Sequence, residues 1–120
     1  MQPSLTLAIL GCATGAISCS DAVCAGVGRP AVAVTVLDSV TGLHAANGAT
    51  LILQSAACFD SAVGATDEQV LSGCVDYAGD YTVIVRKAGY RDWVRAGVHV
   101  RSTCSVETEY LTARLESASP

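Results

Sequence analysis

The sequence lacks concentrated positive charge. Its 120 residues carry 7 Lys and Arg against 11 Asp and Glu, which gives a net charge of −4. A nucleic-acid-binding surface needs clustered Lys and Arg, so we expect no nucleic-acid partner. The basic residues are also unevenly placed, because Arg29 is the only one between Cys19 and Val85, and the others follow from Arg86 to Arg114. We therefore expect opposite charges to pair across neighbouring strands.

The chain is too short for two domains and has no internal repeat, since 120 residues provide one modest core. No segment keeps a helical period for three turns. Apolar residues alternate with polar ones in short segments separated by turns, which predicts an all-β, antiparallel β-sandwich. The expected strands lie in segments 31–37, 48–54, 68–77, 80–90, 92–102 and 105–115. In three of these segments, every second residue is apolar, so we expect that side of the strand to be buried. These residues are Val32, Val34 and Val36 in the first segment, Tyr81, Val83 and Val85 in the fourth, and Leu111, Ala113 and Leu115 in the last.

The usual signs of catalysis are missing as well. Only His44 and His99 could act as bases near neutral pH, and neither lies beside a nucleophile in a recognisable arrangement. The cysteines form no C-x-x-C pair and the two histidines are distant in sequence, so the spacing predicts no zinc site. The stretch "GVGRP" lacks the Lys and the helix of a phosphate-binding loop. We therefore expect no enzymatic activity, no catalytic residue, no metal and no cofactor.

The amino-terminal region lacks charge. Leu5 to Ile17 is a run of apolar and small residues about as long as the core of a signal peptide. It is shorter than the ~20 residues that a membrane-spanning helix needs. The preceding "MQPS" has no Lys or Arg, although signal peptides usually have one there. We expect an exported protein; the alternative, a cytosolic protein with a buried first helix, leaves its six cysteines unexplained.

Two sites resemble a lipobox, in which a small residue precedes a cysteine that receives a lipid. "ILGC" places Gly11 before Cys12, and "AISC" places Ser18 before Cys19. Lipidation of Cys12 would leave five cysteines and one unpaired thiol, whereas lipidation of Cys19 leaves four that can pair completely. We therefore favour Cys19, with residues 1–18 as a lipoprotein signal peptide and residues 19–29 as a short tether. Ordinary signal-peptidase cleavage near Ala16 or Ser18, which would give a soluble secreted protein, stays open.

The four remaining cysteines, Cys24, Cys58, Cys74 and Cys104, allow three disulfide connectivities. The loop from Cys58 to Cys74 is rich in Asp, Ser, Gly and Ala, so burial alone would stiffen it poorly. A disulfide that closes about fifteen residues contributes roughly 3 kcal/mol in the chain-entropy model. We favour Cys58–Cys74 for this reason, which leaves Cys24–Cys104 to tie the start of the domain to the approach of its last strand.

Two stretches, "VAVTVLDSVTGLHAANGATLIL" and "YAGDYTVIVRKAGYRDWVRAGVHV", share several features with a known family. In the first, a strand ends in Asp38 before the turn at Thr41 and Gly42, and Gly48 and Ala49 open the next strand. In the second, Gly79, Tyr81 and Val83 form the pattern G-x-Y-x-V, and Ala88 to Tyr90 close the hairpin. In these features the chain resembles the carboxypeptidase regulatory-like domain, a seven-stranded, transthyretin-like β-sandwich. The resemblance covers residues 30–115 and leaves a tail, 116–120. The chain departs from the family in the long cysteine-bracketed insert from Ala57 to Cys74, which we expect to be a loop up to the strand that starts near Glu68.

The resemblance implies a folding, spacing or interaction module that carries no chemistry itself. With a lipid on Cys19, we expect a non-enzymatic lipoprotein anchored in the cell envelope, where the sandwich meets an envelope protein partner at the membrane surface. Ser20, in place of Asp, resembles the pattern of lipoproteins sent to an outer membrane. The alternative is a carbohydrate-binding module with Tyr90 and Trp93 as aromatic faces and with Arg91 and Asp92 as polar partners. Trp93 is the only tryptophan, and it could instead begin a buried strand.

Overall fold

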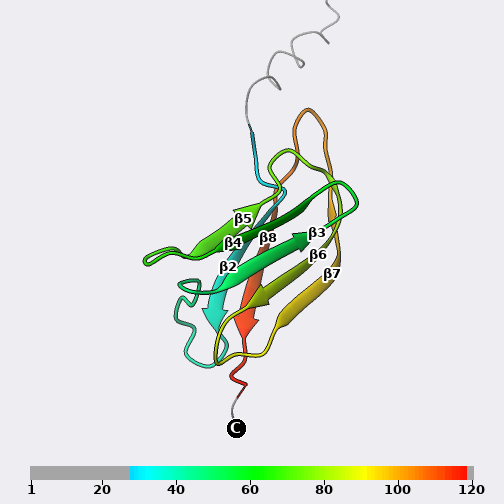
Figure 1. Ribbon diagram of the computed structural model, residues 1–120. Helices are drawn as coiled ribbons and strands as arrows, with labels where there is room; N and C mark the ends of the chain where they lie inside the picture. The colour runs from blue at the N-terminus through cyan, green and yellow to red at the C-terminus, as the bar shows by residue number, and fades with distance from the viewer. Residues whose placement is uncertain (1–27, 119–120) are drawn as a thin grey trace, which may run out of the picture.

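Residues 28–118 of the computed structural model are described, and they form an all-β domain of two facing sheets (Figure 1). Within these residues the strands are β2 (Val32–Asp38), β3 (Thr50–Gln54), β4 (Phe59–Val63), β5 (Val70–Gly73), β6 (Gly79–Arg86), β7 (Trp93–Val100) and β8 (Glu109–Leu115). The three-stranded sheet has the order β5-β2-β8, and the four-stranded sheet has the order β4-β3-β6-β7. The prediction of an all-β, two-sheet domain is confirmed.

The direction of one strand pair differs from the predicted topology. β2 and β8 are parallel, with Val32 opposite Glu109 and Asp38 opposite Leu115. The expectation of a wholly antiparallel sandwich is therefore wrong at this pair. A tight hairpin turn makes two strands antiparallel, but β2 and β8 are the first and last strands of the described domain and no such turn joins them.

The core lies between the sheets and follows the period-two pattern of the sequence. Tyr81, Val83 and Val85 of β6 are all buried, as are the three valines predicted for β2. On β8, Ala113 and Leu115 are buried, while Leu111 is only partly buried against the core. Burying one Val or Leu side chain fully contributes about 2 kcal/mol, so these alternating residues dominate the stability of the sandwich.

β4 lies inside the insert that was expected to be a loop, so that expectation is wrong for residues 59–63. The sequence of β4 lacks the usual alternation of apolar inward and polar outward residues. Its inward positions, Asp60 and Ala62, are polar or small, while Phe59 and Val63 face outward and are 70% and 66% exposed. Asp60 can face inward because its carboxylate accepts a hydrogen bond from the backbone N–H of Cys74 at 2.9 Å.

A disulfide joins Cys58, just before β4, to Cys74, just after β5, and so links the two sheets at one side of the sandwich. This predicted pairing is confirmed. Cys104 is disulfide-bonded as well, but its predicted partner Cys24 lies outside the described residues, so that pairing stays a prediction. The predicted signal peptide, both lipidation candidates and most of the predicted tether also lie outside the described residues. Within residues 28–118, no helix is long and apolar enough to cross a membrane.

The predicted pairing of opposite charges is only partly correct. Asp80 of β6 and His99 of β7 lie opposite each other across the sheet, with 2.7 Å between carboxylate Oδ1 and imidazole Nδ1. The ion pairs between Arg and acidic side chains within residues 28–118 are Arg86–Asp92, Arg91–Glu116 and Arg101–Glu107, and each joins residues that follow Val85. All of these side chains are well exposed, so such pairs contribute about 0–1 kcal/mol each.

Candidate functional site

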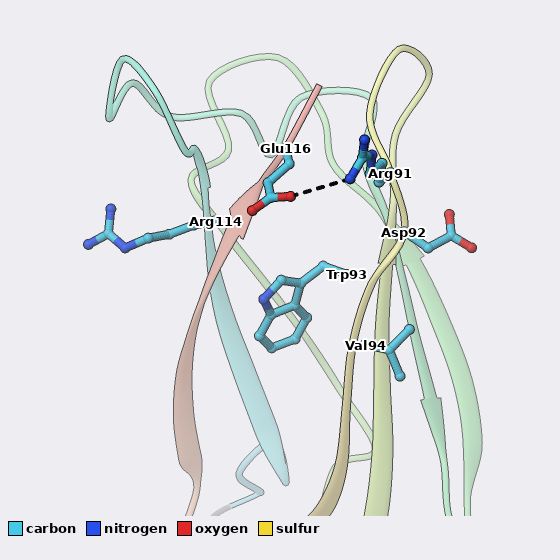
Figure 2. Close-up of a pocket in the computed structure, with 6 residues that line it drawn as sticks. All are labelled: Arg91, Asp92, Trp93, Val94, Arg114 and Glu116. Carbon is cyan, nitrogen blue, oxygen red and sulfur yellow. Dashed lines mark ion pairs between the residues drawn. The ribbon is translucent and has the colours of Figure 1, made fainter. Parts of the chain in front are cut away.

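The side of the sandwich opposite the disulfide is open. β7 is the edge strand of the four-stranded sheet, β8 is the edge strand of the three-stranded sheet, and the two edges lie beside each other. A pocket of about 300 Å³ lies along this opening, lined by Arg91, Asp92, Trp93, Val94, Arg114 and Glu116 (Figure 2). This pocket contains Arg91, Asp92 and Trp93, three of the four residues that the sequence suggested for ligand binding.

The chain after β8 closes one end of the opening. The N–H of Arg91 donates to the carbonyl oxygen of Glu116 at 2.8 Å, and the N–H of Ala118 donates to the carbonyl oxygen of Gly89 at 3.0 Å. The side chains of Arg91 and Glu116 also form an ion pair, with 3.8 Å between Nη1 and Oε1. These contacts join the ends of both sheets and form the rim above Trp93 in Figure 2.

Trp93 occupies the space between the two edges. It lies opposite Val85, a core residue, so its side chain lies on the inner face of the sheet and packs half-buried against the core. The guanidinium of Arg95 lies 5.0 Å from the centre of the indole ring, a cation–π distance. In Figure 2 the ring lies below the Arg91–Glu116 pair, while the side chains of Asp92 and Arg114 point away from it. The polar groups around the indole are therefore those of Arg91, Glu116 and Arg95.

A β-bulge in β7 places Arg95 on the inner face. The pairing register between β6 and β7 shifts by one residue between Tyr81 and Val83, and Gly97 has a φ of 71°. A glycine in this left-handed region is typical of one bulge class, which bends a strand at a sheet edge. The sequence analysis missed the bulge, although a glycine within a strand pattern indicates one. Charged inward residues and bulges at an edge strand both hinder uncontrolled strand pairing.

Tyr90, the remaining residue suggested for ligand binding, has a structural contact. Its hydroxyl donates a hydrogen bond to Oδ2 of Asp38 at 2.6 Å, which connects the segment after β6 to the end of β2. Oδ1 of Asp38 accepts the N–H groups of Val40 and Thr41, both at 2.8 Å. The hydrogen bond from Tyr90 is the largest cause that lowers the pKa of Asp38, and the two backbone hydrogen bonds come next. Together they lower this pKa to about 2. The same carboxylate raises the pKa of Tyr90.

These hydrogen bonds hold a turn that presents apolar side chains. The N–H of Gly42 donates to the carbonyl oxygen of Asp38 at 2.9 Å, and Gly42 has a φ of 75°, which favours glycine. Val40 and Leu43 in this turn are 89% and 69% exposed. We call these two residues the apolar tip. The described chain leads into β2 and this turn follows β2, so the turn lies at the end of the sandwich opposite the point where the described chain begins (Figure 1).

The two histidines lie away from this opening. His44 is exposed and forms an isolated bridge with Leu37. His99 pairs with Asp80 on the outer face of the four-stranded sheet, whereas Trp93 lies on the inner face. Across residues 28–118, no group of three or more His, Cys, Asp or Glu residues could hold a metal ion.

No family model, no curated protein and no solved structure matches this chain. The fold and the contacts described above define a small all-β domain of two sheets, closed on one side by a disulfide and open on the other beside Trp93.

Proposed function

We propose that the chain is a non-enzymatic exported lipoprotein whose single β-sandwich is an interaction module at a membrane surface. The observation that carries the proposal is the Cys58–Cys74 disulfide, because disulfides persist mainly in exported proteins and are rare in the cytosol. It agrees with the uncharged segment Leu5 to Ile17 and the lipobox-like "AISC".

The roles of the motif residues support an interaction module of the carboxypeptidase regulatory-like type. Tyr81 buries its ring and donates its hydroxyl to the carbonyl oxygen of Tyr77 at 2.6 Å. Tyr90 binds Asp38, and Gly42 permits the turn that follows. Each of these residues stabilises the sandwich or its turns. A partner would therefore contact exposed side chains that have no such structural role. The apolar tip is such a surface, and hydrogen bonds of its backbone N–H groups hold the turn in place.

The direction of the chain supports a tethered orientation. The described chain begins at one end of the sandwich, and the apolar tip lies at the other (Figure 1). With a lipid on Cys19 and a bridge from Cys24 to Cys104, five extended residue steps span at most about 18 Å. The Cys104 end would then face the lipid, and the apolar tip would face a partner protein in the envelope.

Site-directed variants test the lipid anchor. We expect Cys19→Ala to release the protein from the membrane fraction or to leave its signal peptide uncleaved, because no other residue would receive the lipid. Cys12→Ala is the matched control and should change neither processing nor fractionation. A Cys19→Ala protein that is processed normally and stays in the membrane fraction would disprove the assignment.

The pocket beside Trp93 favours a second candidate, a carbohydrate-binding module. An indole face flanked by Arg91 and Glu116 offers a stacking surface and polar partners for a sugar ring. Trp93 is the only tryptophan, so all tryptophan fluorescence comes from this pocket. Iodide quenching that decreases when a polysaccharide is added would favour sugar binding. A blue-shifted, unquenched emission that no polysaccharide changes would favour a purely structural Trp93.

A further inference from the structure

The four-stranded sheet leaves its outer face exposed. Phe59, Val63 and Val94 lie on this face and are 70%, 66% and 57% exposed. Large apolar side chains scattered singly over a surface are ordinary, but a contiguous apolar patch marks a site of interaction. Whether these three residues belong to one patch depends on the pairing of the strands.

The pairing registers place them in one continuous, uncharged area. Ile52 of β3 lies opposite Ile84 of β6, and Ile84 lies opposite Val94 of β7, so three aliphatic side chains form a row across the sheet. The neighbouring positions on the same face, which complete the area, are Thr50, Gln54, Phe59, Ser61, Val63 and Thr82. We call these residues, together with the aliphatic row, the outer patch. None of them carries a charge.

Charged groups lie only at the two ends of the outer patch, and the ends differ in kind. At one end of β6, Arg86 donates a hydrogen bond to Asp92 at 3.0 Å. At the other end, the Asp80 carboxylate lies 2.7 Å from the imidazole of His99. Arg86 and Asp80 are six residues apart on the same face of one strand, or about 20 Å at 3.3 Å per residue. The face therefore has the Arg86–Asp92 pair at one end, an apolar centre and the Asp80–His99 pair at the other.

We propose that two copies of this chain associate through the outer patch, face to face. In a symmetric dimer of this kind, the two-fold axis lies in the interface. An axis along the strands would place Arg86 against Arg86 and Asp80 against Asp80. An axis across the strands makes β6 of the two copies antiparallel and places Arg86 of each copy near Asp80 of the other. Charge complementarity selects this second arrangement, with the apolar rows of the two sheets packed together about 10 Å apart.

The size of the face limits the association. Two strands of eight residues and two of five, about 4.8 Å apart, cover roughly 400 Å² per copy, or about 800 Å² for both. This total lies below the range of standard specific interfaces, so we expect a weak and transient dimer. The antiparallel arrangement points the two chain-entry ends in opposite directions, so two copies held close to one membrane by the short tether proposed above could not adopt it. The association therefore applies to copies on facing membranes or to chains without the lipid.

Sedimentation equilibrium of the purified full-length chain over a range of concentrations tests the proposal. We expect a reversible monomer–dimer equilibrium, and we expect Val94→Lys to weaken it about tenfold or more, because an ammonium would be buried in the interface without a partner. Val40→Lys is the matched control, since it also replaces an exposed valine but lies in the apolar tip. A wild-type chain that stays monomeric, or equal association of both variants, would overturn the proposal and leave the outer patch to a different protein.

Charge reversal tests the antiparallel arrangement separately. Arg86→Glu and Asp80→Lys should each weaken the dimer, and the double variant should restore it, because the opposite charges then meet again in exchanged positions. In the arrangement with parallel strands, the double variant would still place like charges together. Circular dichroism of each variant verifies that the sandwich is folded. If both single variants fold and weaken the dimer, but the double variant does not restore it, the antiparallel pairing is refuted.

Discussion

Removing the Cys58–Cys74 disulfide should cost the domain a large part of its stability. The bond joins cysteines with a sequence separation of 16 and connects β4 of one sheet to β5 of the other. For a loop of this length, the chain-entropy model gives about 3 kcal/mol at 25 °C. In a domain of this size, 1 kcal/mol shifts the midpoint of thermal unfolding by about 4–8 °C, so we expect a decrease of about 12–24 °C.

The assay is urea unfolding of the double variant Cys58→Ala/Cys74→Ala beside the wild type. A double variant avoids the reactive thiol that a single substitution would leave, and it spares the disulfide at Cys104, which a reducing agent would also break. Phe59→Ala is the matched control, because it changes an exposed neighbour in β4 and should alter the free energy of unfolding by less than about 0.5 kcal/mol. A double variant within about 0.5 kcal/mol of the wild type would refute the idea that this bond closes the sandwich.

Three further substitutions probe other contacts. Tyr81→Phe should lower the free energy of unfolding by about 1 kcal/mol in urea titrations, because it leaves the carbonyl of Tyr77 without its hydroxyl donor. Gly64→Ala should destabilise more strongly in the same assay, since its Cβ would overlap the backbone of a neighbouring loop; a variant as stable as the wild type would contradict this packing. The pKa of Asp38 is lowered from 3.8 to about 2, so its stabilising effect is fully present above pH 3.8 and is lost as the pH falls through about 2. Tyr90→Phe should make this loss shallower, and an unchanged pH profile of unfolding would refute the role of its hydroxyl.

The sequence predicted the parts of the fold in which burial alone decides the pattern. On β2 and β6, every second residue is a valine or another large apolar residue, and these side chains fill the core. The disulfide was also predictable, because Cys58 and Cys74 bracket a segment rich in Asp, Ser, Gly and Ala, which burial alone would stiffen poorly.

Other parts depend on contacts between segments that are distant in sequence. β4 escaped prediction because Asp60 faces inward and finds its partner at Cys74, beyond the loop. The parallel pairing of β2 with β8 leaves no local trace, since hydrophobic periodicity does not encode strand direction. The bulge in β7 has one local sign, Gly97, whose positive φ only the structure reveals.

The candidate site shows the same division between local and distant contacts. The sequence placed Tyr90, Arg91 and Trp93 together because they are close in the chain. The structure places Arg91 and Trp93 at the pocket and directs the hydroxyl of Tyr90 to Asp38. Glu116 was not predicted, because it reaches Arg91 only through the pairing of the segment after β8 with the segment after β6.

The anchoring of this module through Cys19 is tested most directly by the intact mass of the native exported protein, measured with and without alkylation of free thiols. We predict a chain that begins at Cys19, carries the added mass of acyl chains and has no thiol to alkylate before reduction. A chain without acyl mass, whether it begins at Met1 or near Ala16, would contradict the proposed lipoprotein.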